Sequence, residues 1–241
     1  MFTFQFNFHA STPLSDRSLS GVETQNPSKN MTIKIFTFNP IQENTYVLYD
    51  ETKEAVIIDA GCLFAEEEQM LKQFIDDNEL KLKRVLNTHL HFDHQFGNRF
   101  LFNTFGIAPE AHQADEFLND NFAKQTRAFG FDNMGEAQPL KAYIADNEKI
   151  RFGNSELTAI HVPGHSPGSL VYYNAEDGVL FTGDVLFLES IGRTDLVGGD
   201  YATLIKNITE RLLTLPESTV VYPGHGDSTT IGYEKVHNPY L

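Results

Sequence analysis

Three histidines and one aspartate lie within six residues, in the segment NTHLHFDH (87–94). Imidazole and carboxylate groups are ligands that suit zinc, iron or manganese. His89 and His91 are two residues apart, so on an extended segment their side chains point the same way. Asp93 and His94 are adjacent, and one turn of the chain can aim both at a neighbouring point. Ligands spaced in this way divide into two pairs, which favours two metal ions over one.

Each pair needs a further histidine, and two histidines in similar settings are available. His165 lies in HVPGHSPGS and His225 in YPGHGDS, and both follow a glycine. Asp184 ends the segment LFTGD, and its carboxylate could bridge both ions. Two ions about 3.5–4 Å apart form a clamp for hydrolysis. The spacing therefore predicts a pair of divalent cations in a centre suited to hydrolysis.

These candidate ligands follow strand-like runs such as KRVLNT, ELTAIHV and STVVYPGH, and loops that leave a rigid scaffold are the usual place for chemistry. Two amphipathic helices are expected over 63–78 and 200–215, and the interval 95–147 reads as mostly helical and irregular. The alternation of strands and helices predicts a mixed α/β domain in which helices pack on sheets. The strands are expected at 31–38, 44–50, 54–59, 83–88, 149–153, 156–162, 169–174, 178–184 and 218–225.

The first 30 residues differ in composition from the rest of the chain. They are rich in Ser, Asn, Pro and Gly and offer little to bury. We interpret 1–30 as a disordered leader or a mis-assigned start, with Met31 as the natural start of a single domain over 31–241. The segment FTFQFNF (2–8) alternates Phe with polar residues, so an ordered edge strand there is the alternative.

Composition excludes several classes of function. With 33 acidic and 18 basic residues the formal net charge is −15, which opposes nucleic acid as a partner. Cys62 is the only cysteine, so a disulfide within the chain and a cysteine-rich zinc site are both excluded. No run of 18 or more apolar residues predicts a membrane span, and the N-terminus lacks the pattern of a signal peptide. A cytoplasmic enzyme with no membrane partner is expected.

Five motifs resemble those of the metallo-β-lactamase superfamily. THLHFDH matches the family signature T-H-x-H-x-D-H, and IIDAG, HVPGHSPGS, FTGD and YPGHG recur in the family's order. The resemblance covers roughly Met31 to the C-terminus. It implies an α/β fold, the four-layer αββα sandwich, with the site at one edge of the two sheets.

The resemblance also implies the role of each polar residue. The first metal is assigned to His89, His91 and His165, and the second to Asp93, His94 and His225. Asp184 bridges the two ions, and Asp59 supports the site from outside the ligands. The ions are expected to be two divalent cations, zinc first, with iron or manganese as alternatives.

Two further segments resemble one subgroup of this superfamily. SIGRTDLVGGDY (190–201) and TTIGYEKVHNPYL (229–241) are similar to compact, single-domain, glyoxalase II-like hydrolases of bacteria. These imply hydrolysis of a small-molecule thioester of the S-D-lactoylglutathione type by a metal-bound hydroxide, with Asp93 or Asp184 taking the proton. Arg193 and Asp195 are expected to pair and brace the loop after Asp184. The β-lactamases proper usually carry cysteine at the Asp184 position, which disfavours antibiotic hydrolysis.

Other functions are compatible with the same residues. A persulfide dioxygenase shares the fold and the GRTD segment (192–195) but uses one iron, held by His89 or His91 with His165 and Asp184. A non-catalytic metal-binding or regulatory domain is a further alternative. An RNA-processing hydrolase is disfavoured by the acidity. The larger glyoxalase II enzymes carry a C-terminal helical domain that helps to hold glutathione, and no counterpart follows YPGHG here. A homodimer is an open alternative, because the family often forms dimers.

Overall fold

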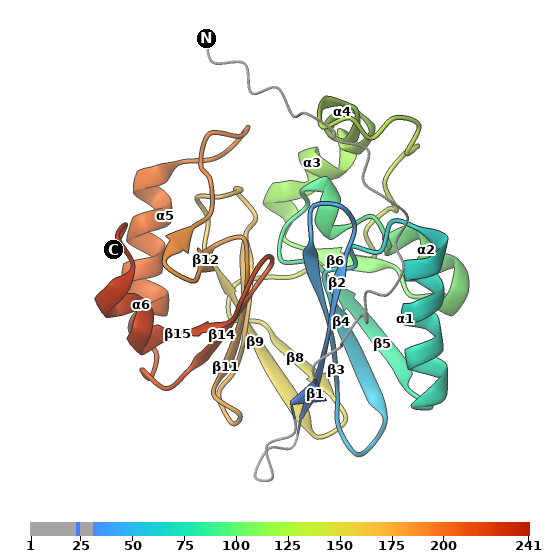
Figure 1. Cartoon of the computed structure of the whole chain (residues 1–241), viewed down its shortest axis with the longest axis horizontal. Coiled ribbons are helices and arrows are strands. Elements are labelled where there is room, and N and C mark those ends of the chain that lie inside the picture. Colours follow the sequence, from blue (N-terminus) through green and yellow to red (C-terminus); the bar gives the residue numbers. More distant parts are fainter. Residues whose placement is uncertain (1–22, 25–30) are drawn as a thin grey trace, which may run out of the picture.

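Two β-sheets face each other at the centre of the molecule, and helices cover their outer faces (Figure 1). The computed structural model describes residues 31–241 and the backbone of residues 23 and 24. The arrangement confirms the expected four-layer αββα sandwich. The alternative edge strand at 2–8 lies outside the described residues, and so does the segment 1–30 predicted as a leader or mis-assigned start, apart from residues 23 and 24. No helix among the described residues is long and apolar enough to cross a membrane.

The first sheet has seven strands in sequence order. Strands β1 to β4 pair antiparallel, and β4 to β7 pair parallel. Its strands are β1 (Glu23–Thr24), β2 (Thr32–Phe38), β3 (Glu43–Tyr49), β4 (Glu54–Ile58), β5 (Lys81–Leu86), β6 (Pro109–Ala111) and β7 (Ala142–Tyr143).

The second sheet has six strands in the order β15-β14-β11-β10-β9-β8, and a separate two-stranded hairpin (β12, β13) follows Asp184. All its pairs are antiparallel except β11 with β14. The strands are β8 (Lys149–Phe152), β9 (Ser155–His161), β10 (Leu170–Asn174), β11 (Val179–Gly183), β12 (Leu186–Phe187), β13 (Ser190–Ile191), β14 (Val220–Pro223) and β15 (Thr229–Thr230).

Helices α1 and α2 lie on the outer face of the first sheet, and α5 and α6 on that of the second (Figure 1). Both predicted amphipathic helices are present, since α1 falls within 63–78, and α5 with its π-helical turn η3 falls within 200–215. The helices are α1 (Ala65–Asp77), α2 (Asn98–Phe105), α3 (Glu116–Asp120), α4 (Phe122–Ala128), α5 (Tyr201–Asn207) and α6 (Ile231–His237), with short turns η1 (Phe92–His94), η2 (Gln113–Asp115) and η3 (Ile208–Leu212).

The start of α1 shows why the chain turns helical there. The Glu67 carboxylate accepts hydrogen bonds from the backbone N–H groups of Leu63 and Phe64, at 2.8 and 3.2 Å, and satisfies donors that the first turn leaves free. Leu71 and Ile75, one turn apart, are buried against the sheet. The acidic residues of the first turn also suit the positive end of the helix dipole.

A continuous apolar core lies between the two sheets. It joins Leu48 and Ile58 of the first sheet to Tyr172 and Phe181 of the second, and all four side chains are buried. Every residue of β3 and of β11 is buried, as expected for strands covered on both faces. This packing fixes the two sheets against each other and so fixes the loops at their edge.

The interval 95–147 differs in part from the expectation of helix and irregular structure. It contains α2, α3 and α4, but also β6 and β7, which extend the first sheet. These strands are three and two residues long, too short to show the alternation by which strands are recognised in a sequence. The pairing of β6 with β5, and of β7 with β6, is decided by the tertiary fold.

Candidate metal centre

The ends of strands from both sheets bring the seven predicted ligands together. The loop after β5 carries four of them, the β9–β10 loop carries His165, and Asp184 and His225 follow β11 and β14. Their ligand atoms form overlapping sets in which all atoms lie within 4.8 Å of one another: His89, His91 and His165; His89, His94 and Asp184; and Asp93, His94 and His225.

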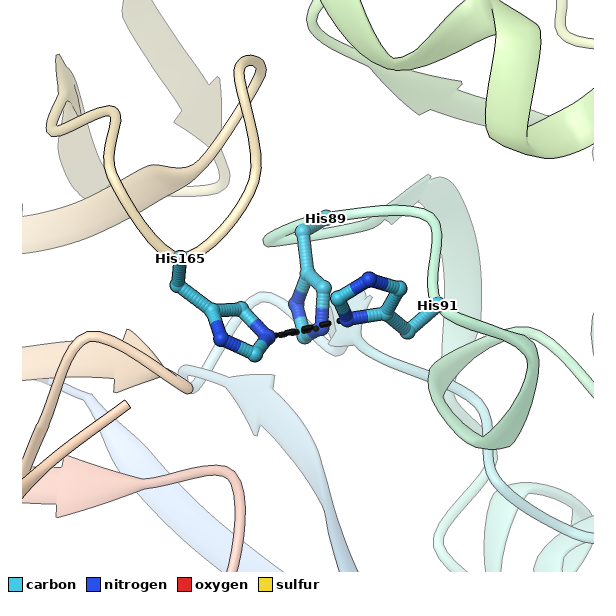
Figure 2. A group of neighbouring side chains, drawn as sticks. All are labelled: His89, His91 and His165. Atoms are coloured by element: carbon cyan, nitrogen blue, oxygen red, sulfur yellow. Dashed lines mark hydrogen bonds between the residues drawn. The ribbon is translucent and has the colours of Figure 1, made fainter. Parts of the chain in front are cut away.

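The first group consists of three buried imidazoles that converge from two loops (Figure 2). Nε2 of His165 lies 2.9 Å from Nδ1 of His91 and 3.2 Å from Nε2 of His89. Two nitrogens bound tetrahedrally at about 2.1 Å from one zinc ion would be about 3.4 Å apart. The three nitrogens therefore surround a point that a single cation fits.

The second group is built on the 3-10 turn η1, which holds Asp93 and His94. Oδ2 of Asp93 lies 3.3 Å from Nε2 of His225 and 3.7 Å from Nε2 of His94. The turn aims the two adjacent side chains at one point, as the sequence suggested. His225 is the most open member, with 22% of its side chain exposed.

The carboxylate of Asp184 lies between the two groups. Its Oδ1 is 3.3 Å from Nε2 of His94, and its Oδ2 is 3.7 Å from Nε2 of His165. Oδ1 of Asp184 and Nε2 of His94 are both buried, yet neither has a hydrogen-bond partner of acceptable geometry among the described residues. Buried polar atoms are rarely left in this state, and a divalent cation between them would satisfy both.

The glycine before His225 is required by this close packing. A Cβ atom on Gly224 would lie 2.4 Å from Oδ1 of Asp184 and 2.7 Å from Cε1 of His94. Any larger residue would displace the Asp184 carboxylate or the His94 imidazole. The glycine of YPGHG therefore leaves the space that the side chains of Asp184 and His94 occupy.

Hydrogen bonds to the outer ring nitrogens orient four of the five imidazoles. Such bonds fix which nitrogen faces a metal. In each case Nδ1 is the bonded atom and Nε2 faces the centre. The pairs are His94 with Oδ2 of Asp59 (2.9 Å), His165 with the Arg193 carbonyl (2.8 Å), His225 with the Gln42 carbonyl (3.1 Å) and His89 with Oγ1 of Thr88 (3.0 Å).

Asp59, which was expected to support the site, contacts both His94 and Thr88. Its Oδ1 accepts from the backbone N–H of Thr88 at 2.7 Å, and its Oδ2 accepts from the Thr88 hydroxyl at 2.7 Å. Its backbone has a φ of 51°, a left-handed conformation that is uncommon for a residue other than glycine. This strained turn directs the carboxylate beneath the ligand loop.

Charge is divided unequally between the two groups. Burial lowers the pKa of His91 to about 3, with His165 adding to the effect, and burial likewise holds the pKa of His89 well below its ordinary value. Burial opposes ionisation of Asp184 as well, but His94 and His225 outweigh it and hold the pKa of this carboxyl well below the usual range. His89 and His91 are therefore neutral near pH 7, which is the form of imidazole that binds a metal.

The second group carries the positive charge that balances the carboxylates. Burial lowers the pKa of His94, but Asp184, Asp93 and Asp59 outweigh it, so its net pKa is well above the ordinary value. Burial also opposes the rise in the pKa of His225, where Asp184 and Asp93 prevail. The carboxylates thus require cations at these atoms, which either protons or metal ions can supply.

Arg193 and Asp195 form the expected ion pair, with two contacts of 2.7 and 2.8 Å between the guanidinium and the carboxylate. Both side chains are more than half exposed. The backbone carbonyl of Arg193, rather than its side chain, reaches the centre through His165. The pair therefore supports the loop on which that carbonyl lies.

Asp115 is a buried carboxylate that was not singled out from the sequence. Asp115 has no exposed surface, and its oxygens accept from the backbone N–H of Leu90 (3.2 Å), from the backbone N–H of Gly168 (2.6 Å) and from the Ser166 hydroxyl (2.8 Å). It ties the loop of the first two histidines to the loop of His165. In the sequence only its position after β6 could indicate a role, and that strand was not predicted.

His161 lies in none of the sets of ligand atoms found among the described residues. Its Nε2 is 2.8 Å from the Pro167 carbonyl, and its ring stacks on His112 with 4.0 Å between centroids. Cys62 is buried, and burial raises the pKa of its thiol well above the ordinary value.

Comparison with known proteins agrees with this geometry. The chain is 37% identical over 212 residues to the hydroxyacylglutathione hydrolase GloC of Haemophilus influenzae, covering 88% of this chain and 98% of that protein. Among solved structures it resembles BLEG-1, described as a B3 metallo-beta-lactamase (39% identity, TM-score 0.78, 87% of this chain and 99% of that chain). It also resembles TTHA1623 in a di-iron-bound form (35% identity, TM-score 0.76, 86% and 99%).

The His and Asp groups, the fold and these relatives point the same way. The sets of ligand atoms imply bound divalent metal ions, and the named relatives include a hydrolase. Residues 38–225 match the metallo-beta-lactamase superfamily, so the chain belongs to that superfamily.

Proposed function

We propose that the protein is a binuclear metal-dependent hydrolase that cleaves a thioester of the hydroxyacylglutathione type, with zinc as the metal. The observation that carries the proposal is the position of Asp184, whose two oxygens face His94 of one group and His165 of the other. A carboxylate shared in this way is what a two-ion clamp requires. The similarity to a hydroxyacylglutathione hydrolase supports the choice of thioester.

When bound, the ions would supply a Lewis acid for the thioester carbonyl and a water whose pKa is lowered to about 7. The chain's own residues supply the geometry. The buried imidazoles of His89, His91 and His165 hold one position. Asp93, His94 and His225 hold the other, and the partial exposure of His225 leaves that side open to a substrate.

Asp93 and Asp184 are the carboxylates placed to accept a proton from the attacking water. Both have a pKa below the ordinary value, because His94 outweighs the effect of burial, so both are ionised near neutral pH. The single thiol, Cys62, is buried with a raised pKa, which makes it a poor nucleophile. Water is therefore the nucleophile that the site supports.

A mononuclear iron dioxygenase that acts on persulfides is the second candidate. Oδ2 of Asp184 lies 3.7 Å from Nε2 of His165, so these two residues with His89 or His91 can also be read as a three-ligand site. The GRTD segment, which resembles that of this candidate, contains Arg193, whose carbonyl contacts His165. The two candidates differ in metal number and in the use of oxygen.

The test starts with elemental analysis of protein purified without added metal. The same protein is assayed for cleavage of S-D-lactoylglutathione, for oxygen uptake with glutathione persulfide, and for hydrolysis of a chromogenic cephalosporin. About two metal ions per chain with thioester cleavage alone is the expected result. One iron with oxygen uptake would move the assignment to the dioxygenase, and cephalosporin hydrolysis without thioester cleavage would move it to the lactamases.

We further propose a cytoplasmic protein that acts on a small molecule, without nucleic-acid or membrane partners. The support is the net charge of −15 and the small size of the thioester. A homodimer is proposed on family resemblance alone. Size-exclusion chromatography with light scattering distinguishes a dimer of about twice 27.2 kDa from a monomer.

A further inference from the structure

Glu43 is a buried carboxylate close to the metal centre that the proposed chemistry does not use. It begins β3, and its side chain has no exposed surface. Its Oε2 accepts a hydrogen bond from the Thr45 hydroxyl at 2.8 Å, whereas its Oε1 has no hydrogen-bond partner among the described residues. A buried carboxylate oxygen in this state is costly, so a specific function is the simplest reason to retain it.

The side chain of Glu43 faces His94 from behind. Its Oε1 lies 4.0 Å from Nδ1 of His94, the same nitrogen that lies 2.9 Å from Oδ2 of Asp59. Glu43, Asp59 and His94 form a fourth set of candidate ligand atoms, on the outer side of the imidazole. Two carboxylates thus lie behind a histidine whose opposite nitrogen, Nε2, faces the centre. Carboxyl groups placed there orient the imidazole as a ligand.

The backbone around Glu43 meets the other histidine of the second group. Glu43 and His225 form an antiparallel β-bridge, and the N–H of Asn44 donates to the Gly224 carbonyl at 2.8 Å. The preceding carbonyl, of Gln42, lies 3.1 Å from Nδ1 of His225. One short segment therefore contacts both imidazoles of the second group, which come from loops 131 residues apart in the chain.

The carboxylate also supports the turn that carries Asp59. The Thr45 hydroxyl that donates to Glu43 accepts from the backbone N–H of Gly61 at 3.0 Å. A Cβ atom added to Gly61 would lie 1.9 Å from Oε2 of Glu43, so the carboxylate packs directly on this backbone. Movement of Glu43 would be transmitted to Asp59 and from there to His94.

From these contacts we propose that Glu43 is a positioning residue for the second metal position, formed by Asp93, His94 and His225. The inference rests on the two-ion centre of the proposed function. The first group is more remote from Glu43, because the Arg193 carbonyl orients His165, and Glu43 reaches Thr88 and His89 only through Asp59. Loss of the Glu43 carboxylate should therefore weaken the second metal position more than the first.

Two substitutions divide the contribution of the oxygen that faces His94 from that of packing. Glu43→Gln keeps the size and an oxygen for Thr45 but turns an NH₂ group towards His94. Glu43→Ala removes both. Since loss of such an outer partner typically costs 10–100-fold in metal affinity, we expect the second dissociation constant to rise about 10-fold in the first variant and about 100-fold in the second.

Glu234 offers a matched control. It is equally buried, and its carboxylate accepts from the backbone N–H of Glu189 (3.0 Å), the Thr229 hydroxyl (2.6 Å) and the Asn238 amide (2.8 Å), all outside the metal centre. Glu234→Gln should lower the thermal midpoint without changing either metal dissociation constant. It separates a general loss of stability from a specific effect on one metal position.

The experiment titrates metal-free, full-length protein with Co²⁺ and follows the visible absorption, with elemental analysis after dialysis against a competing chelator. Wild type and Glu234→Gln should bind two ions per chain, and the Glu43 variants should bind one tightly and lose the second. Wild-type affinity at both positions in Glu43→Gln and Glu43→Ala would overturn the inference, as would equal weakening of both positions. If Glu43→Ala does not fold, as judged by circular dichroism, Glu43→Gln alone decides.

The outcome can be separated from that of the proposed function, because no substrate is involved. A wild-type protein that binds two ions but cleaves no thioester would refute the substrate assignment and leave this inference intact. A wild-type protein that binds only one ion would overturn the inference, since there would be no second position to support.

Discussion

The carboxylate of Asp59 holds the ligand loop at two points, since it lies 2.9 Å from Nδ1 of His94 and also accepts from the backbone and the hydroxyl of Thr88. It needs both of its oxygens as acceptors. An asparagine has only one carbonyl oxygen, so its NH₂ group would face a donor on one side or the other. The identity of this residue is therefore set by hydrogen-bond chemistry as much as by charge.

Asp59→Asn is accordingly expected to reduce metal affinity at His94 by about 10–100-fold, because the imidazole loses its orienting acceptor. Metal content after chelator competition measures the effect. Asp50→Asn is a suitable control, since Asp50 is also buried and accepts several hydrogen bonds, but its partners are Thr52, Asn154 and Ser155. Equal metal affinity in Asp59→Asn and wild type would contradict the role assigned to Asp59.

Asp184→Ala should lower metal content and thioester cleavage together, because it removes the carboxylate between the two groups. Elemental analysis and an activity assay on the same preparation measure both. Two retained metal ions with undiminished turnover would show that Asp184 does not bridge.

His161→Ala should leave the metal stoichiometry unchanged. The ring contacts Pro167 and His112 rather than any ligand, so we expect only a loss of about 1 kcal/mol in the free energy of unfolding, the usual worth of one hydrogen bond. Urea denaturation and elemental analysis test this together. Loss of one metal equivalent would mean that the ligands were assigned wrongly.

Asp50 predicts a pH dependence of stability. Burial raises the pKa of this carboxyl, but hydrogen bonds from Thr52, Asn154 and Ser155 outweigh burial, and the net pKa lies below the ordinary value. A group with a lowered folded-state pKa stabilises the protein above its unfolded pKa of about 3.9 and loses that contribution as the pH falls through the folded value.

In metal-free protein, Asp50→Asn should therefore lower the free energy of unfolding by about 1–3 kcal/mol at pH 7, with the difference from wild type shrinking below about pH 4. Urea denaturation at pH 7, 5 and 3.5 measures the difference. A gap between the two proteins that is constant over this range would mean that the charge of Asp50 contributes nothing.

The candidate ligands of the first motif could be found in the sequence because their spacing is local. The spacing predicts that the side chains of His89 and His91 point one way and those of Asp93 and His94 another. The 3-10 turn over 92–94 directs the second pair. The long strands and the helix α1 were equally visible, since their apolar periodicity extends over many residues. These features depend on neighbours in the chain.

The supports of the ligands could not be found in the same way. Two imidazoles are oriented by the backbone carbonyls of Arg193 and Gln42. Every residue has a backbone carbonyl, so the residue type does not predict this contact. Asp115 and Glu43 are acidic residues like many others until the fold buries them. Only the tertiary structure brings them beneath the loops that they hold.

The two sheets contribute unequally but jointly to the metal centre, because the loop after β5 belongs to the first sheet and His165, Asp184 and His225 belong to the second. Each bound ion would thus cross-link the two halves of the sandwich, which the apolar core also holds together. Ligands that bind only the folded state stabilise it by mass action. Scanning calorimetry with and without chelator should show a lower midpoint for the stripped protein, so that cellular metal supply would govern how long each molecule survives as well as how fast it works.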